Sequence, residues 1–156
     1  MRIPGPASPP LVDLAYLLFP ALWIGLLTGV CFIATLAKFH APSLSRQAAL
    51  DVGRTTFAAW NHVEWGLLIL ALPLLLYSEN RLDSVLAFGM VGAVLLTQTM
   101  VLLPVLNGRA GAIIAGAKPA PSADHAVYVA ADILKTAILA SIIWREWARF
   151  VSLLHP

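Results

Sequence analysis

Charged side chains are scarce in this sequence. Only 12% of its 156 residues are charged, whereas soluble domains carry about a quarter. Hydrophobic residues make up 60% of the chain, and the mean hydropathy is +0.83. Such a composition predicts an integral membrane protein with the lipid bilayer as its surroundings, formed by a single domain that spans residues 1–156.

Several function classes lack support. The formal net charge is only +2 and there is no run of Lys or Arg, so no nucleic acid is expected as a partner. The glycine-rich nucleotide loop, the His-Glu-x-x-His zinc motif and the nucleophile elbow are all missing. A non-enzyme is therefore favoured and no catalytic residue is assigned. Intramembrane catalysis stays open. A carboxylate beside a lysine in a low-dielectric pocket has shifted pKa values, and such shifts are common among catalytic groups.

Four long apolar stretches are present instead, at residues 14–36, 57–78, 84–106 and 126–144. Each is close to the roughly 20 residues that a membrane-spanning helix needs. Backbone polar groups in lipid must be satisfied within the segment, which favours helices. The short link SENRLDS predicts that the second and third helices form an antiparallel hairpin. The expected fold is an all-α, four-helix transmembrane bundle with up-down topology, multi-pass in the cell membrane and most simply in a bacterial inner membrane.

The orientation of this bundle is left open. The short tail MRIPGPASPP at the N-terminus is too rich in proline to be helical. An even number of spans places both termini on one side, together with four basic residues of the tails and the hairpin link, and the other side carries five. The positive-inside rule gives no preference between these two sides.

The last apolar stretch carries two charges, Asp132 and Lys135. A charge at the centre of a bilayer costs about 2.5–3.5 kcal/mol on insertion scales. Three helical residues are offset by about 60°, so the two side chains can pair. Tyr128 and His125 fall on the same stripe, within an arc of about 80°. The fourth helix is therefore expected to have one polar face.

The second helix is expected to have a matching stripe of Arg54, Asn61 and Glu64, again within an arc of about 80°. At 1.5 Å per residue, Glu64 comes to lie about 10 Å from the membrane side that carries the starts of the second and fourth helices. Asp132, Lys135, Gln98 and Thr28 come to lie between about 9 and 13 Å from the same side. The sequence thus predicts a buried polar layer with a Glu64–Lys135–Asp132 cluster. Its predicted ligand-binding or ionic-core residues are Glu64, Asp132, Lys135, Asn61, Gln98, Arg54 and Tyr128.

Two interpretations of this layer remain open. Intramembrane ionisable residues are functional candidates by default, and such a cluster would bind a small ligand or relay protons. Buried ion pairs also fix the register of helices without any further role. In that case the chain is a structural or accessory membrane subunit. Gly25 and Gly29 have the GxxxG spacing, which suits contact with a second copy or with another membrane protein.

The stretch WIGLLTGVCFIATLAKFHAP, residues 23–42, carries a family resemblance. With Trp23 and Gly25 early in the first helix and Ala41-Pro42 after it, the chain resembles the transmembrane-205-like proteins. These are small four-helix membrane proteins grouped as a domain of unknown function. The resemblance implies the same four-span fold from about Leu14 to Trp144 and a membrane location. It implies no particular reaction.

The Trp-x-Gly pair is also similar to an early helix of copper-resistance membrane domains and haem-linked four-helix proteins. This likeness implies a third, less favoured function in haem or copper handling. Bis-His haem needs two facing imidazoles, and His62 is the one histidine clearly inside a predicted helix. It lies about 160° around the axis from Glu64, off the polar stripe. No metal ligand and no cofactor is therefore assigned.

Overall fold

The computed structural model describes residues 10–76 and 81–154. Every element in this part of the chain is helical, which confirms the all-α class. The predicted proline-rich tail lies outside it except for Pro10, as do Ser78, Glu79 and Asn80 of the predicted hairpin link. The elements are α1 (Pro10–Leu27), η1 (Thr28–Ala34), α2 (Thr35–His40), α3 (Arg46–Leu76), α4 (Arg81–Thr97), η2 (Gln98–Leu102), α5 (Leu103–Ile114) and α6 (Asp124–Leu154).

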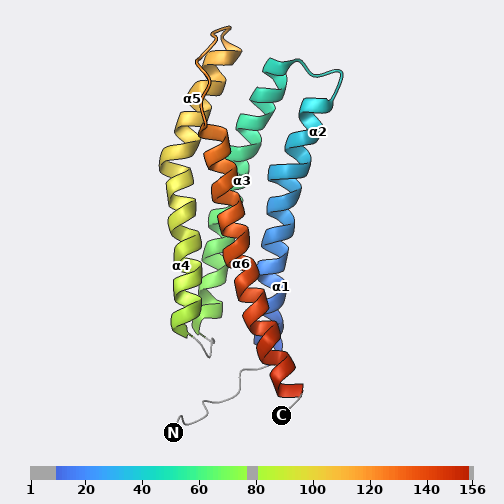
Figure 1. The fold of residues 1–156 in the computed structure, drawn as a ribbon, viewed down its shortest axis with the longest axis vertical. Helices are drawn as coiled ribbons and strands as arrows, with labels where there is room; N and C mark the ends of the chain where they lie inside the picture. Colours follow the sequence, from blue (N-terminus) through green and yellow to red (C-terminus); the bar gives the residue numbers. More distant parts are fainter. Residues whose placement is uncertain (1–9, 77–80, 155–156) are drawn as a thin grey trace.

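These elements form four rods, because α1, η1 and α2 are continuous, as are α4, η2 and α5 (Figure 1). The loop 41–45 between α2 and α3 and the link 115–123 between α5 and α6 lie together at one end of the bundle, called the loop end below. Each rod contains a segment long and apolar enough to cross a membrane. These segments are Leu14–His40, Arg46–Leu76, Leu82–Ile114 and Asp124–Ser152.

The segments are longer than the apolar stretches in the sequence. Polar residues at the loop end continue the helices, as in Arg46–Thr56 of α3 and Asn107–Ile114 of α5. Polar side chains that face outward do not stop a helix whose backbone hydrogen bonds are intact. The helices are interrupted around the two prolines at 119 and 121: α5 ends at Ile114, and α6 begins at Asp124.

Gly116 closes α5 in a Schellman motif. Its φ is +88°, the N–H of Gly116 donates to the Ile113 carbonyl, and the N–H of Ala117 donates to the Ala112 carbonyl. This left-handed conformation suits glycine because it has no Cβ. The motif satisfies carbonyls at the end of the helix and turns the chain towards the extended Lys118–Pro121 segment.

An apolar cluster fills much of the bundle interior, including the part between the polar layer and the end opposite the loops. Trp23, Leu27, Leu139 and Ile142 are at most 1% exposed and lie where α1 packs on α6. Many large apolar side chains instead point outward, including Leu70 of α3, which is 65% exposed. An inside with tightly packed apolar groups and an outside that is also apolar is typical of a helix bundle surrounded by lipid.

Two π-helical segments interrupt the rods, and the sequence reading did not predict them. In η2 the wider turn ends with the Leu103 N–H donating to the Gln98 carbonyl, just before Pro104, which has no N–H. A π-segment inserts an extra residue into the turn and so changes which side chains face inward. Here it lies where Gln98 and Thr99 point into the bundle.

The small residues of the GxxxG-like pairs do not hold helices of this chain together. A Cβ added at Gly25, Gly29 or Gly89 would meet no atom within 4 Å. These faces are therefore directed outward, and contact through Gly25 and Gly29 with another chain stays a prediction.

Candidate functional site

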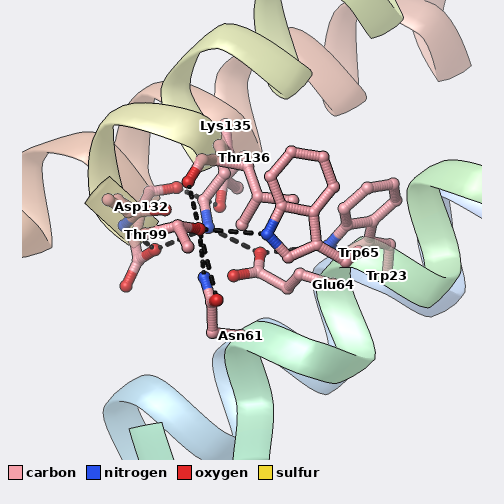
Figure 2. Close-up of polar contacts among 10 residues, drawn as sticks. Trp23, Asn61, Glu64, Trp65, Thr99, Asp132, Lys135 and Thr136 are labelled. Atoms are coloured by element: carbon pink, nitrogen blue, oxygen red, sulfur yellow. Dashed lines mark hydrogen bonds and ion pairs between the residues drawn. The ribbon is translucent and has the colours of Figure 1, made fainter. Parts of the chain in front are cut away.

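Three ionisable side chains meet in the middle of the bundle, and they are called the ionic cluster below. Lys135 of α6 places its Nζ 2.5 Å from Glu64 Oε1 of α3 and 3.0 Å from Asp132 Oδ1, one turn earlier on its own helix (Figure 2). The exposed fractions of Glu64, Lys135 and Asp132 are 0%, 0% and 1%. One ammonium group thus bridges two carboxylates with no contact to solvent.

The other two rods each contribute a donor to these carboxylates. The indole Nε1 of Trp23 in α1 donates to Glu64 Oε1 at 3.2 Å. The amide Nε2 of Gln98 in η2 donates to Asp132 Oδ1 at 2.9 Å. All four rods therefore take part in one hydrogen-bonded cluster, which fixes how the helices are rotated relative to one another.

A second polar group, the Thr99 network, lies beside the ionic cluster (Figure 2). The Thr99 hydroxyl accepts from Asn61 Nδ2 at 2.9 Å and from Trp65 Nε1 at 3.0 Å. It donates to the carbonyl of Leu95, 2.7 Å away. With two bonds accepted and one donated, the hydroxyl is saturated. The Thr99 network joins α3 to η2 and has no spare capacity for a ligand at this oxygen.

The structure brings together four of the residues predicted for the layer: Glu64, Asp132, Lys135 and Gln98. Asn61 lies in the neighbouring Thr99 network. Tyr128 is buried, at 1% exposure, one turn from Asp132 towards the loop end.

Two residues named in the prediction lie outside the ionic cluster. Arg54 lies at the loop end, where its side chain is 43% exposed and pairs with Asp51 at 2.6 Å. It shares a helix face with Glu64, but ten residues of helix separate their depths by about 15 Å. Thr28, expected near the depth of Lys135, is exposed on the outside of η1. In its place the first rod presents Trp23.

Sequence reasoning also missed Trp23, Trp65 and Thr99 as members of the layer. Tryptophans in apolar stretches are usually assigned to packing or to the membrane interface. Their buried N–H groups nevertheless need acceptors, and the depth of Trp23 relative to Glu64 was the only available signal. Thr99 adjoins Gln98, and an ideal helix would not turn both inward. The π-segment η2 does so.

The charges in the ionic cluster do not balance when every group is ionised, because two carboxylates face one ammonium. An unpaired charge in a dry interior carries a large desolvation penalty. The cluster is electrically neutral when one carboxyl group holds a proton. Glu64 Oε2 is suited to that proton, because the protein's donors converge on Oε1 and leave Oε2 without a partner.

Other buried polar atoms nearby also have unused hydrogen-bonding capacity. Gln98 Oε1 and the Tyr128 hydroxyl are buried and have no hydrogen-bond partner in the part of the chain that the structure describes. Native interiors satisfy the large majority of such groups. Around the cluster the protein therefore offers two acceptors and one hydroxyl to a proton, a water molecule or a small polar ligand.

Access to the cluster differs between the two ends of the bundle. On the side away from the loops, Leu67, Leu139 and Ile142 belong to the close-packed apolar cluster. On the loop side, Tyr128 packs edge-on against Phe57, with ring centroids 5.4 Å apart. Cys31 of η1, about two turns from Trp23 towards the loop end, is also buried. The polar side chain that follows the cluster along α6, Tyr128, therefore lies on the loop side.

The described residues contain no group of three His, Cys, Asp or Glu placed to hold a metal ion. His62 is exposed, and its Nδ1 lies 2.7 Å from the carbonyl oxygen of Ala58 on the same helix. It does not face another histidine across the bundle. Nothing in the geometry of this part of the chain favours haem or copper.

Comparisons with known protein families, curated proteins and solved structures give no match for this chain. The resemblance to the transmembrane-205-like proteins stays a prediction that nothing here tests.

Proposed function

We propose that the chain is a multi-pass membrane protein, inserted as an up-down bundle in a cell membrane, whose ionic cluster takes up protons from the loop end and releases them to the other side. The four long apolar rods and their outward apolar side chains support the membrane setting. The observation that carries the functional part is the pairing of two buried carboxylates with one buried ammonium. Such a cluster changes charge when a proton enters or leaves.

A proton-linked membrane function fits the surroundings of this cluster. Buried Glu64 Oε2 and the Tyr128 hydroxyl have no hydrogen-bond partner among the described residues, and Tyr128 lies on the loop side of the cluster. The apolar cluster closes the other direction. Passage across the whole bundle therefore requires Trp23, Leu139 and their neighbours to separate, as in alternating access, rather than an open proton wire.

The experiment is proton flux into liposomes of phosphatidylethanolamine and phosphatidylglycerol that hold a pH-sensitive dye. With an imposed pH gradient and membrane potential, the protein should raise the rate above that of protein-free liposomes. Glu64→Gln removes the proton-carrying oxygen and should return the rate to the protein-free level. Asp83→Asn, the same acid-to-amide change at an exposed side chain near the start of α4, should keep the flux. Equal rates with and without the native protein would contradict the proposal.

A structural or accessory subunit is the second candidate. The observation in its favour is that Gly25 of α1 and Gly29 of η1 leave an open small-residue face, where a Cβ would meet no atom of the described residues within 4 Å. On this account a second copy or another membrane protein packs there. Gly25→Leu and Gly29→Leu should then dissociate a complex seen by light scattering in detergent, while Gly89→Leu on α4 should not. A monomeric native protein would remove the support for a second copy.

A further inference from the structure

A pocket of about 100 Å³ opens at the loop end between α2, α3, α5 and α6. Its apolar wall includes Phe57, Leu103 and Leu106, and its polar groups are Lys38, Arg54, Asn107 and His125. The space is enough for several water-sized atoms, so it accommodates a small head group rather than a whole metabolite. It lies apart from the ionic cluster, with Tyr128 and Phe57 between them.

Lys38 lines this pocket without an ion pair to another described residue, and the pocket is called the Lys38 pocket below. Its Nζ lies 5.1 Å from the ring centroid of Phe57 and 5.4 Å from that of Phe39. Within the described residues it has neither an ion pair nor a hydrogen bond. A half-buried ammonium group with aromatic contacts but no counter-ion is an attractive site for an anion.

The Lys38 side chain lies directly against the backbone of α3, at a position where the residue has no Cβ. A Cβ at Gly53 would lie 2.7 Å from Lys38 Nζ, closer than real contacts allow. Glycine in a helix interior costs about 1 kcal/mol relative to alanine, yet here it leaves the space that the ammonium group occupies. The amine is therefore seated against the helix rather than extended towards solvent.

The surroundings of the pocket are also basic. Arg54, which lines the pocket, forms an ion pair with Asp51, and Arg109 lies 3.8 Å from Asp124. Lys38, Arg46 and Lys118 have no ion pair in the part of the chain that the structure describes. Basic groups therefore exceed acidic ones at the loop end, and an approaching anion would be attracted.

We propose that the Lys38 pocket binds the phosphate or carboxylate head of an anionic amphiphile, with its apolar part along Phe57, Leu103 and Leu106. Lys38 supplies the charge, and the Asn107 amide and His125 supply further polar contacts. The apolar wall distinguishes such a ligand from an inorganic anion. This site is independent of proton exchange at the ionic cluster, so either proposal can fail without the other.

The test is isothermal titration calorimetry of the full chain in a neutral maltoside detergent, with octyl phosphate below its micelle concentration as the probe. Lys38→Met removes a hydrogen bond to a charged group, worth about 1.5–3 kcal/mol. The dissociation constant should therefore rise by a factor of about 10 to 100. Lys118→Met, an equal loss of charge at the same end, should change it by less than about threefold. Octyl glucoside, with the same chain and a neutral head, should not compete.

Gly53→Ala provides a second variant, because alanine favours the helix while its Cβ displaces the Lys38 amine. It should weaken octyl phosphate binding without lowering the melting temperature. Octyl phosphate binding that is equal in the native, Lys38→Met and Gly53→Ala proteins would overturn the proposal. So would equal binding of octyl glucoside, or of inorganic phosphate.

Two further probes identify the source of the head group. Competition by phenyl phosphate would assign the pocket to a soluble anion with a compact apolar part. Competition by short-chain phosphatidylglycerol without competition by phenyl phosphate would assign it to a membrane lipid. Both results support a site for an anion on an apolar body.

Discussion

Lys135 determines whether two carboxylates can be buried side by side. It lies 2.5 and 3.0 Å from Glu64 and Asp132, and all three side chains are inaccessible to solvent. Removing the buried ammonium group leaves an uncompensated carboxylate, whereas replacing a protonated carboxyl group by an amide leaves the charge of the cluster unchanged. The two kinds of substitution should therefore differ in their effect on stability.

Lys135→Met should lower the free energy of unfolding by about 3–5 kcal/mol, because it leaves two carboxyl groups without their ammonium. Glu64→Gln should cost no more than about 1 kcal/mol, because an amide replaces a protonated carboxyl group without changing the charge of the cluster and keeps an acceptor for Trp23 and Lys135. Thermal unfolding in detergent would compare them. Equal losses for the two variants would show that the Glu64 carboxyl group is ionised in the native cluster.

Thr99→Val should lower the free energy of unfolding by about 1–3 kcal/mol, because Asn61 and Trp65 lose their common acceptor in a buried place. Thr97→Val is the matched control two residues earlier. Its exposed hydroxyl bonds only the Ala93 carbonyl of its own helix, so a change within about 0.5 kcal/mol is expected. The same melting-temperature assay measures both. If the two variants are equally stable, the Thr99 network contributes nothing to the bundle.

For single residues, the sequence predicts the site where a polar or charged residue type is energetically unfavourable in an apolar stretch. Glu64, Gln98, Asp132 and Lys135 stand out in apolar stretches, and helical rise and rotation place them at one depth. Trp23 is not costly in an apolar helix, so nothing in the composition marks it as a donor to Glu64. Arg54 follows the correct angular stripe but lies too far along the axis.

The hydropathy of the sequence predicts where the four helical rods lie, but it does not predict where the helices begin and end. The apolar stretches locate all four rods, but the polar first turns of α3 and the last turns of α5 extend beyond them. The π-segments have no sequence signal beyond Pro104 after η2. Since η2 turns both Gln98 and Thr99 inward, this unpredicted element joins the ionic cluster to the Thr99 network.

Gly116→Ala should destabilise the chain by about 1–2 kcal/mol, since a Cβ is strained in the left-handed conformation that ends α5. Gly108→Ala, in the interior of α5 with open space around it, should instead stabilise by up to about 1 kcal/mol. Thermal unfolding of the pair tests whether the Schellman motif sets this end of the helix. Stabilisation by both substitutions would contradict a φ of +88° at Gly116.

As a whole, the molecule has two unlike ends. Lys38 with its pocket, Arg46 and Lys118 lie without ion pairs among the described residues at the loop end, from which we propose that protons reach the ionic cluster. The apolar cluster closes the way to the other end. Counts of Lys and Arg in the sequence do not separate the two membrane sides. The difference comes from which basic groups are paired and where the polar side chains converge.

Cysteine labelling in sealed vesicles tests the arrangement of the bundle in a membrane. In a Cys31→Ala background, Ser43→Cys in the loop 41–45 and Ser122→Cys in the link 115–123 should react with a membrane-impermeant maleimide from the same side. Asp83→Cys near the start of α4 should react only from the opposite side. Reaction of all three from one side would exclude the proposed four-span insertion.

The central claim is that the ionic cluster holds a proton on a buried carboxyl group. Infrared spectroscopy measures this directly, through the carbonyl stretch of a protonated carboxylic acid. The native protein at neutral pH should show such a band, shifted in D₂O and absent from Glu64→Gln, but retained in Asp51→Asn, which changes an exposed carboxylate. A native spectrum without this band, or a band unaffected by Glu64→Gln, would contradict the claim.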